Sequence, residues 1–125
     1  MKYGRAVIVD HLESVELRPG RSDVYDREIQ LQTLFEDPKS GAEHYLIRYP
    51  AGLRTRLHTH SASHAVVVLE GRLEVNGQVI GPHAYAHFPA REAMVHAPAD
   101  GGSCLFVIVF DGPVDAKVVD QWCVA

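Results

Sequence analysis

The stretch Gly52-Leu-Arg-Thr-Arg-Leu-His58-Thr-His60-Ser-Ala-Ser-His64-Ala-Val-Val-Val-Leu-Glu-Gly71 contains three histidines within seven residues. His58 and His60 are two residues apart, and alternate side chains of a β-strand share one face, so their imidazoles can point to the same place. The triplet Ser-Ala-Ser at 61–63 is typical of a turn, and His64 opens the apolar run that follows it. A tight reversal there would bring His64 back beside the first two histidines.

The composition excludes several kinds of partner. A chain of 125 residues is long enough for one domain that buries its own core. The formal charge of −4 provides no basic surface, so we expect no nucleic acid partner. The longest apolar stretches, such as residues 104–110, are too short to span a bilayer, and residues 1–10 lack the apolar region of a secretory signal. We therefore expect no membrane partner and a cytoplasmic location.

Two cysteines occur in the chain, Cys104 within an apolar run and Cys123 near the last residue. Their spacing matches no disulfide framework, so both are expected to be reduced thiols, and Cys104 is expected to be buried packing.

Alternation of apolar and polar residues predicts short strands separated by turns, with no long helical pattern. The Asn76-Gly77 pair predicts a tight hairpin, and Arg18-Pro19-Gly20 predicts a turn. The predicted strands are 6–9, 14–17, 28–36, 42–49, the histidine strand that begins after Gly52, 72–75, 78–80, 84–88 and 104–110. Such regular spacing indicates an all-β sandwich or barrel.

The glycine and histidine spacing resembles the first motif of the cupin superfamily, in which the position of His64 is usually Glu. That motif comprises Gly52, His58, His60, His64 and Gly71. The second motif of the family, a glycine, a proline-centred turn and a histidine, resembles Gly77 through Pro89 to His96. Here that turn is longer than usual, with Arg91 where the family has glycine.

The resemblance covers about residues 28–115 and extends to small RmlC-like single-domain cupins, among them cupin-type anti-sigma-factor domains and metal-dependent dioxygenases. It implies a double-stranded β-helix, or jelly-roll, barrel with short N- and C-terminal extensions, so that residues 1–125 form a single cupin domain. It also implies a homodimer, since open sheet edges need cover.

The resemblance further implies that His58, His60, His64 and His96 bind one divalent transition metal inside the barrel. Imidazole is a common ligand of such metals, and the alternative is that these are polar residues on a solvated strand edge. With His64 in place of Glu, the ligands contribute no negative charge, which favours anionic ligands such as enolates and carboxylates. Four histidines can close a tetrahedral zinc site, or leave two positions open on iron, nickel, manganese or cobalt. The sequence does not distinguish these metals.

Four further residues are candidates for the pocket or its mouth. In a regular strand Arg54 and Arg56 share the face of His58 and could attract an anionic substrate, although a bulge would reverse this inference. Tyr85 and His87 share one face of the strand at 84–88 and would line the pocket if that face points inward.

The sequence is compatible with three functions. The first is a metal-dependent enzyme, such as a dioxygenase that acts on a small dicarbonyl or aromatic substrate. The second is a non-enzymatic module that senses a metal or a small ligand, for which we find no helical partner-binding segment before residue 28. The third is a small sugar-type isomerase, which would tolerate loss of His58 and His60. Fold alone does not choose among them.

Overall fold

The structure is a computed structural model that describes residues 2–122, so the prediction for Cys123 lies outside the described residues. Within them the regular secondary structure is almost entirely β-strand, with one short 3₁₀ helix. The elements are η1 (Leu12–Ser14), β1 (Arg18–Gly20), β2 (Ile29–Glu36), β3 (Glu43–Tyr49), β4 (Arg56–Thr59), β5 (His64–Glu70), β6 (Leu73–Val75), β7 (Gln78–Ile80), β8 (Tyr85–Phe88), β9 (His96–Pro98), β10 (Cys104–Phe110) and β11 (Lys117–Trp122).

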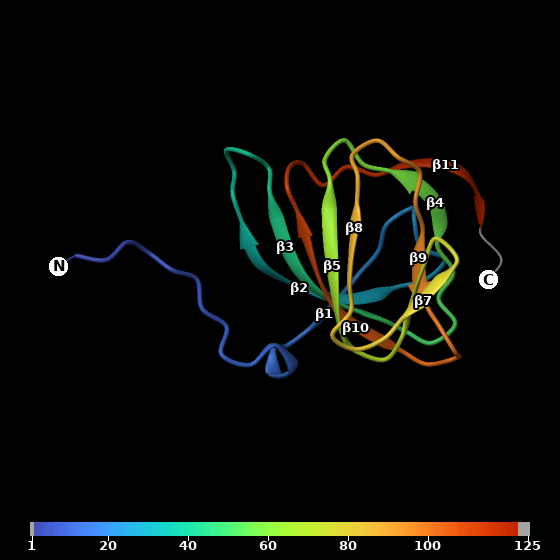
Figure 1. Cartoon of the computed structure of the whole chain (residues 1–125), viewed down its shortest axis with the longest axis horizontal. Coiled ribbons are helices and arrows are strands. Elements are labelled where there is room, and N and C mark those ends of the chain that lie inside the picture. The colour runs from blue at the N-terminus through green and yellow to red at the C-terminus, as the bar shows by residue number, and fades with distance from the viewer. Residues whose placement is uncertain (1, 123–125) are drawn as a thin grey trace.

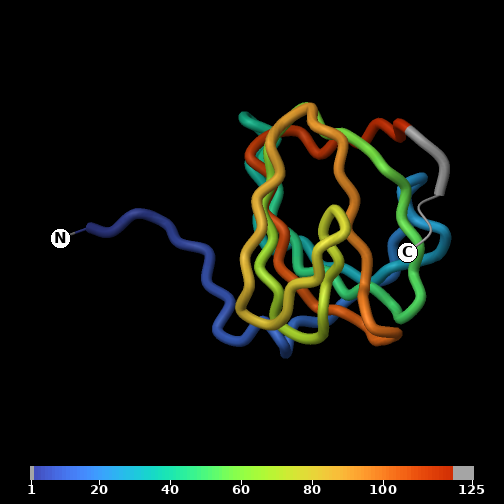
Figure 2. The backbone as a smooth tube through the Cα atoms, turned by 45° about the vertical axis from the view of Figure 1, so that its right-hand side comes forward, coloured from blue at the N-terminus to red at the C-terminus, as the bar shows by residue number. Residues whose placement is uncertain are grey.

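The strands form two walls that face each other. One wall is a six-stranded antiparallel sheet in the order β1-β2-β3-β10-β5-β8, and the other combines the sheet β7-β6-β9 with the pair β11-β4. Figure 1 shows the large sheet opposite β4, β7 and β9, and Figure 2 shows the backbone turned by 45° from that view. The sheets are hydrogen-bonded separately rather than as one closed barrel, and the predicted all-β jelly-roll architecture is confirmed.

The core lies between these walls and is built on β10. This strand is apolar throughout and pairs with β3 on one side and β5 on the other, so both of its hydrogen-bonding edges are satisfied. Phe106 and Ile108 pack inward with Val66 and Val68 of β5, all at most 2% exposed. Each such side chain contributes on the order of 1.5–3 kcal/mol by burial. Cys104 is also fully buried, and burial raises the pKa of its thiol to about 11, in keeping with the predicted packing role.

Two turns follow directly from their residues. Asn76 and Gly77 both have positive φ, 48° and 87°, as a two-residue hairpin between β6 and β7 requires. Gly71 ends β5 with φ 74°, and a Cβ at this position would collide with the carbonyl oxygen of Ser103. Only glycine therefore allows the chain to turn there.

Two N-terminal strand predictions are wrong. The range 6–9 is extended but unpaired, with Val7 66% and Ile8 76% exposed, and 14–17 is not a strand. Instead the predicted turn at 18–20 forms β1, because it pairs with Ile29–Leu31 at the edge of the large sheet. Proline has no backbone N–H to donate. It is tolerated in an edge strand, because one side of that strand has no neighbouring strand that needs this hydrogen bond. Within the described residues, no helix is long and apolar enough to cross a membrane.

Candidate metal centre

β4 and the residue that follows it place His58 and His60 on one inward face. The strand pairs with β11, and a further bridge joins His58 to Met94. His58 is 3% and His60 9% exposed, whereas Thr59 between them is only half-buried. Their ring centroids are 4.9 Å apart. The alternation expected of the histidine strand therefore holds over this short segment.

The turn after His60 is clamped by two aspartates. The backbone N–H of Ser61 donates to Oδ1 of Asp115 at 2.8 Å, and the hydroxyl of Ser63 donates to Oδ2 of Asp111 at 2.6 Å. The backbone N–H of Asp111 in turn donates to the carbonyl of Ser63 at 3.0 Å. The clamped turn sends the chain back into β5, so His64 lies with its ring centroid 4.9 Å from that of His60.

His96 joins the cluster from β9. The hydroxyl of Thr55 donates to the carbonyl oxygen of His96 at 3.0 Å, and the hydroxyl of Tyr49 lies 2.8 Å from its Nδ1. The His96 ring centroid is 6.4 Å from that of His58 and 6.1 Å from that of His64. The structure thus brings together the four histidines that the sequence singles out.

The spacing of these rings only partly suits a common ion. Imidazoles bound at about 2.0–2.1 Å in neighbouring coordination positions would have ring centroids about 4.5–5.2 Å apart. The separations along His58, His60 and His64 agree with this, whereas both separations to His96 are longer. Among the described residues, no group of three or more His, Cys, Asp or Glu has its donor atoms placed to hold a metal ion. The four rings therefore converge, but they are not arranged around one coordination centre.

The chemical type of the donor atoms suits a transition metal. Nδ1 of His58 lies 2.7 Å from the carbonyl oxygen of Arg56, which can only accept, so Nδ1 carries the proton and Nε2 keeps its lone pair. Within the part of the chain that the structure describes, Nδ1 of His60 and both ring nitrogens of His64 are buried without a hydrogen-bond partner. A buried polar atom left unpaired costs about 1–3 kcal/mol, so this cluster is stabilised by any ligand that accepts lone pairs.

Burial keeps the four imidazoles neutral at pH 7. Desolvation is the main cause of the lowered pKa in each, and for His64 it combines with the nearby His60 and His58 to lower the pKa to about 3. The neutral form is the one that binds metals, so protons do not compete for these nitrogens near neutral pH.

The cluster opens into a pocket of about 830 Å³. Its walls are mainly aliphatic and come from the inward faces of β2, β3 and β10, and its rim carries three cationic side chains and one carboxylate. The lining includes Val24, Tyr25, Ile29, Leu31, Tyr45, Ile47, His58, His60, His96, Ile108, Phe110, Val114 and Val118, with Arg21, Arg56, Lys117 and Asp23 among the charged residues.

Two arginines were predicted at the mouth of the pocket. Arg56 lines the pocket, whereas Arg54 is exposed and points away from it. The reason is a change of alternation, since Leu53 and Thr55 are buried before the strand and His58 is buried within it. β4 begins only at Arg56, so the regular strand needed for Arg54 to share the inward face is absent.

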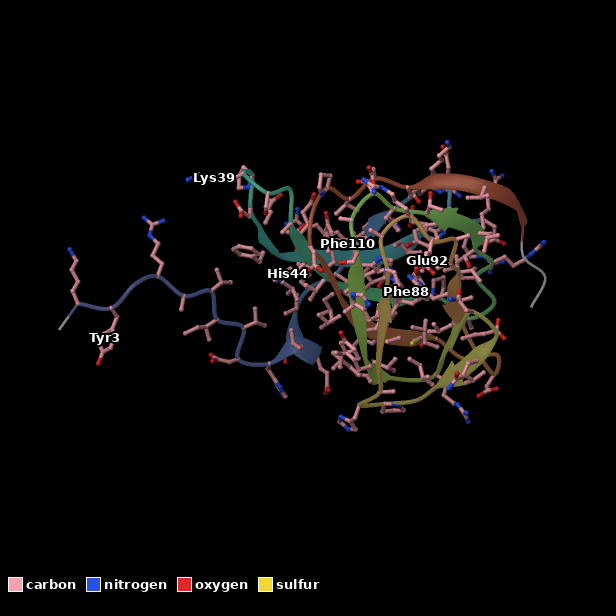
Figure 3. All side chains as sticks on the ribbon, turned by 45° about the horizontal axis from the view of Figure 1, so that its top comes forward. Tyr3, Lys39, His44, Phe88, Glu92 and Phe110 are labelled. Carbon is pink, nitrogen blue, oxygen red and sulfur yellow. The ribbon has the colours of Figure 1, made fainter. Side chains whose placement is uncertain are left out.

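Tyr85 and His87 lie on the outer face of β8 and do not contribute to the pocket. Tyr85 is 64% exposed and His87 is also exposed, whereas Phe88 of the same strand is buried. Phe88 instead stacks on His64 with ring centroids 4.6 Å apart, and Phe110 stacks on the same ring at 4.7 Å. Figure 3 labels both phenylalanines within the body of the molecule.

Four residues at the site were not predicted from the sequence, namely Tyr25, Tyr49, Asp111 and Asp115. Alternation along residues 42–49 groups Tyr49 with Tyr45 and Ile47, but barrel core is the plainer interpretation of that face. Tyr25 lies in a polar segment, and its nearness to Tyr49 depends on the bridge between Tyr25 and Thr55. Neither contact has a signal in local sequence.

Comparisons with known proteins identify the fold. Neither the known protein-family models nor the curated proteins include a match to this chain. Among solved structures, a cupin-like protein from Thermotoga maritima superposes with a TM-score of 0.74 at 17% identity, covering 86% of this chain and 89% of its own. An acetylacetone dioxygenase from Acinetobacter johnsonii gives a TM-score of 0.71 at 19% identity, covering 97% of this chain and 86% of its own.

A structure with a different role has the same fold. The complex of Rhodobacter sphaeroides SigE with the anti-sigma ChrR matches with a TM-score of 0.63 at 18% identity, covering 82% of this chain and 52% of that one. At such identities the likeness shows the fold and leaves the chemistry open.

Proposed function

We propose, from the premise that this chain has the cupin fold, that it is a metal-dependent enzyme that acts on a small dicarbonyl or aromatic substrate, as a dioxygenase does. In this proposal His58, His60, His64 and His96 bind one divalent transition metal. The observation that carries it is the set of buried imidazoles with unpartnered nitrogens beside a pocket of ligand size.

The pocket favours a substrate with an apolar body. A volume of about 830 Å³ is typical of a small-molecule site, and aliphatic side chains such as Ile29, Ile47 and Ile108 form much of its wall. The charged rim adds Arg21, Arg56 and Lys117 against Asp23, an excess of positive charge that attracts an anion. A diketone in its enolate form combines both properties. The likeness to a protein named as an acetylacetone dioxygenase supports this substrate class.

The metal would supply a Lewis acid, which stabilises the negative charge of an enolate or carbonyl oxygen. The protein side chains do the remaining work. Because all four candidate ligands are neutral, they leave the positive charge of the metal undiminished. The aliphatic wall excludes water and holds the apolar part of the substrate, while the cationic rim orients its anionic end.

Metal analysis and oxygen uptake test this proposal. Purified protein is expected to contain about one divalent metal per chain, with six-coordinate geometry by X-ray absorption. After anaerobic loading with iron(II), addition of acetylacetone or an aromatic diketone is expected to start oxygen consumption. His58→Ala and His60→Ala should each lose both metal and uptake. His87→Ala, which removes an exposed imidazole from the outer face, is the matched control and should keep both.

The outcomes separate the alternatives. Metal binding without oxygen uptake, under iron, nickel, manganese or cobalt and with every diketone tried, would contradict the enzyme proposal. A closed four-coordinate zinc site would do the same. The likeness to the SigE and anti-sigma ChrR complex favours a sensing module in that case. Such a module should respond to metal with a change of partner affinity rather than with turnover.

A further inference from the structure

A chain of hydroxyl groups runs from the pocket wall to the far side of His96. The hydroxyl of Tyr49 lies 2.8 Å from Nδ1 of His96 and 3.1 Å from the hydroxyl of Tyr25. Tyr25 lines the pocket, and Tyr49 is fully buried behind it. Since Nδ1 is engaged by Tyr49, Nε2 is the nitrogen of His96 that remains for the pocket and the other imidazoles.

Packing fixes where the hydroxyl of Tyr49 points. Its ring lies edge-on to Phe106 at 4.8 Å and edge-on to Tyr25 at 5.4 Å, and it stacks with His96 at 5.6 Å and 23°. A ring held on several sides in this way leaves the hydroxyl no other direction. The backbone of His96 is fixed independently by the hydrogen bond from Thr55. Both ends of the contact between Tyr49 and His96 are therefore rigid.

The number of protons limits how this chain can be arranged. Tyr49 has one hydroxyl proton and two partners, so it donates to one and accepts from the other. Burial raises the pKa of Tyr49 well above its usual value, which keeps that proton in place at neutral pH. If Tyr49 donates to Tyr25, it accepts from Nδ1–H of His96. If it donates to His96, Nε2 carries the proton and cannot offer a lone pair.

His58 shows which arrangement suits the cluster. Its Nδ1 donates to a backbone carbonyl and leaves Nε2 unprotonated, as a ligand requires. We propose that Tyr49 acts in the same way on His96, accepting its Nδ1–H and donating to Tyr25, and so holds Nε2 of His96 as a lone-pair donor. Tyr49 is a positioning residue that Tyr25 secures. The use of this tautomer for metal binding rests on the proposed function, whereas the tautomer itself does not.

Nitrogen NMR of metal-free protein labelled with ¹⁵N-histidine tests the tautomer. We expect His96 to be protonated at Nδ1 in the natural protein. Tyr49→Phe keeps the ring and removes the hydroxyl, so it should shift His96 toward the Nε2-protonated form, and Tyr25→Phe should shift it in part. An Nε2-protonated His96 in the natural protein would overturn the proposal, and so would a tautomer that Tyr49→Phe leaves unchanged.

Metal affinity provides the second measurement. In competition with a chelator, Tyr49→Phe is expected to weaken Co²⁺ binding about 10–100-fold, as loss of a partner behind a ligating histidine typically does. Tyr45→Phe is the matched control, because this pocket tyrosine donates its hydroxyl to Glu43 instead, and its Co²⁺ affinity should not change. Equal affinity in Tyr49→Phe would count against the positioning role.

The two measurements test the tautomer and the proposed function independently of each other. If the natural protein binds no Co²⁺, the proposed function fails while the NMR result still decides the tautomer. If Tyr49→Phe does not fold, as circular dichroism would reveal, the natural protein and Tyr25→Phe still give the tautomer that the proposal requires or forbids.

Discussion

His64 occupies a place that suits an imidazole better than a carboxylate. β5 lies between β8 and β10, so His64 is flanked in register by Phe88 and Phe110, and its ring stacks on both. The faces of aromatic rings carry partial negative charge, which would repel a carboxylate at this position. The stacked imidazole pays no such cost, and the departure from the glutamate of the resembling motif is thereby explained.

The same surroundings predict that His64 lowers the stability of the metal-free protein. Both of its ring nitrogens are buried and have no hydrogen-bond partner among the described residues, so His64→Phe removes unsatisfied polar atoms and continues the aromatic stack. We expect the metal-free variant to gain about 1–3 kcal/mol in free energy of unfolding, measured with urea in the presence of a chelator. Its Co²⁺ affinity should fall at least tenfold. A less stable variant would show that these nitrogens have partners in the metal-free protein.

The candidate site was predictable where local alternation suffices. His58 and His60 follow from their spacing, and His64 from the short turn before an apolar run. The prediction for Arg54 was wrong because the inward-facing positions change from odd to even residue numbers just before β4. No residue type in the sequence signals this change. Tyr25 could not be found at all, since its role depends on contact with a residue 24 positions away.

Among the elements, the turn between β4 and β5 controls how His60 and His64 approach each other. Asp115 accepts a hydrogen bond from the backbone of Ser61, and Asp115→Ala removes it. We expect a loss of about 0.5–1.5 kcal/mol in stability and a several-fold weaker Co²⁺ affinity, because the turn that carries two candidate ligands becomes looser. Thermal unfolding and chelator competition measure the two effects.

Asp37→Ala is the matched control for that variant. Asp37 accepts comparable hydrogen bonds from the backbone of Lys39 and the hydroxyl of Ser40, but in the hairpin between β2 and β3. Its loss should lower stability by a similar amount and leave Co²⁺ affinity unchanged. If both variants weakened the metal equally, the clamp at Ser61 would have no special part in the site.

The success of the element predictions depended on whether the signal was local. The hairpin at Asn76-Gly77 and the apolar strand β10 were predicted almost to the residue, because turn chemistry and hydrophobicity reside in the segment itself. β1 was missed, since Arg18-Pro19-Gly20 is a strand only through its pairing with β2. The inward face of β8 likewise depends on its neighbours, which place Phe88 rather than His87 toward the core.

On the scale of the whole molecule, the buried histidines predict acid sensitivity of the metal-free protein. The pKa of His64 is lowered from 6.5 to about 3 on folding. Between these values the unfolded chain binds a proton that the folded chain does not, so stability rises with pH. The contribution of His64 to the free energy of unfolding is therefore fully present above about pH 6.5 and is lost as the pH falls toward 3.

Urea unfolding at pH 7.5 and pH 5, both with a chelator, measures this dependence. His64 alone should account for a loss of about 2 kcal/mol at pH 5, because pH 5 lies about 1.5 pH units below the unfolded pKa of 6.5 and each unit contributes about 1.36 kcal/mol. His64→Phe should reduce the loss. A metal-free protein equally stable at both pH values would contradict the lowered pKa.

The extended segment at residues 2–10 predicts that two copies associate. It leaves the body of the molecule in Figures 1 and 2, and it exposes Tyr3, Val7 and Ile8, which are 84%, 66% and 76% accessible. On the large sheet, β1 pairs only with Ile29–Leu31, so the outer edge of β2 beyond these residues has no neighbouring strand in the described sheet. We propose that the segment of one copy pairs with this edge in the other, which buries apolar side chains and satisfies backbone groups at once.

Sedimentation at micromolar concentration is expected to give the mass of a homodimer. Placing charge on the segment through Val7→Asp combined with Ile8→Asp should produce a monomer, because the paired strand would then bury carboxylates, while the melting of the barrel remains cooperative. Val119→Asp is the control, since this valine is 54% exposed on β11 at the opposite side of the molecule from the segment. A natural protein that sediments as a monomer, or a double variant that remains dimeric, would exclude this mode of association.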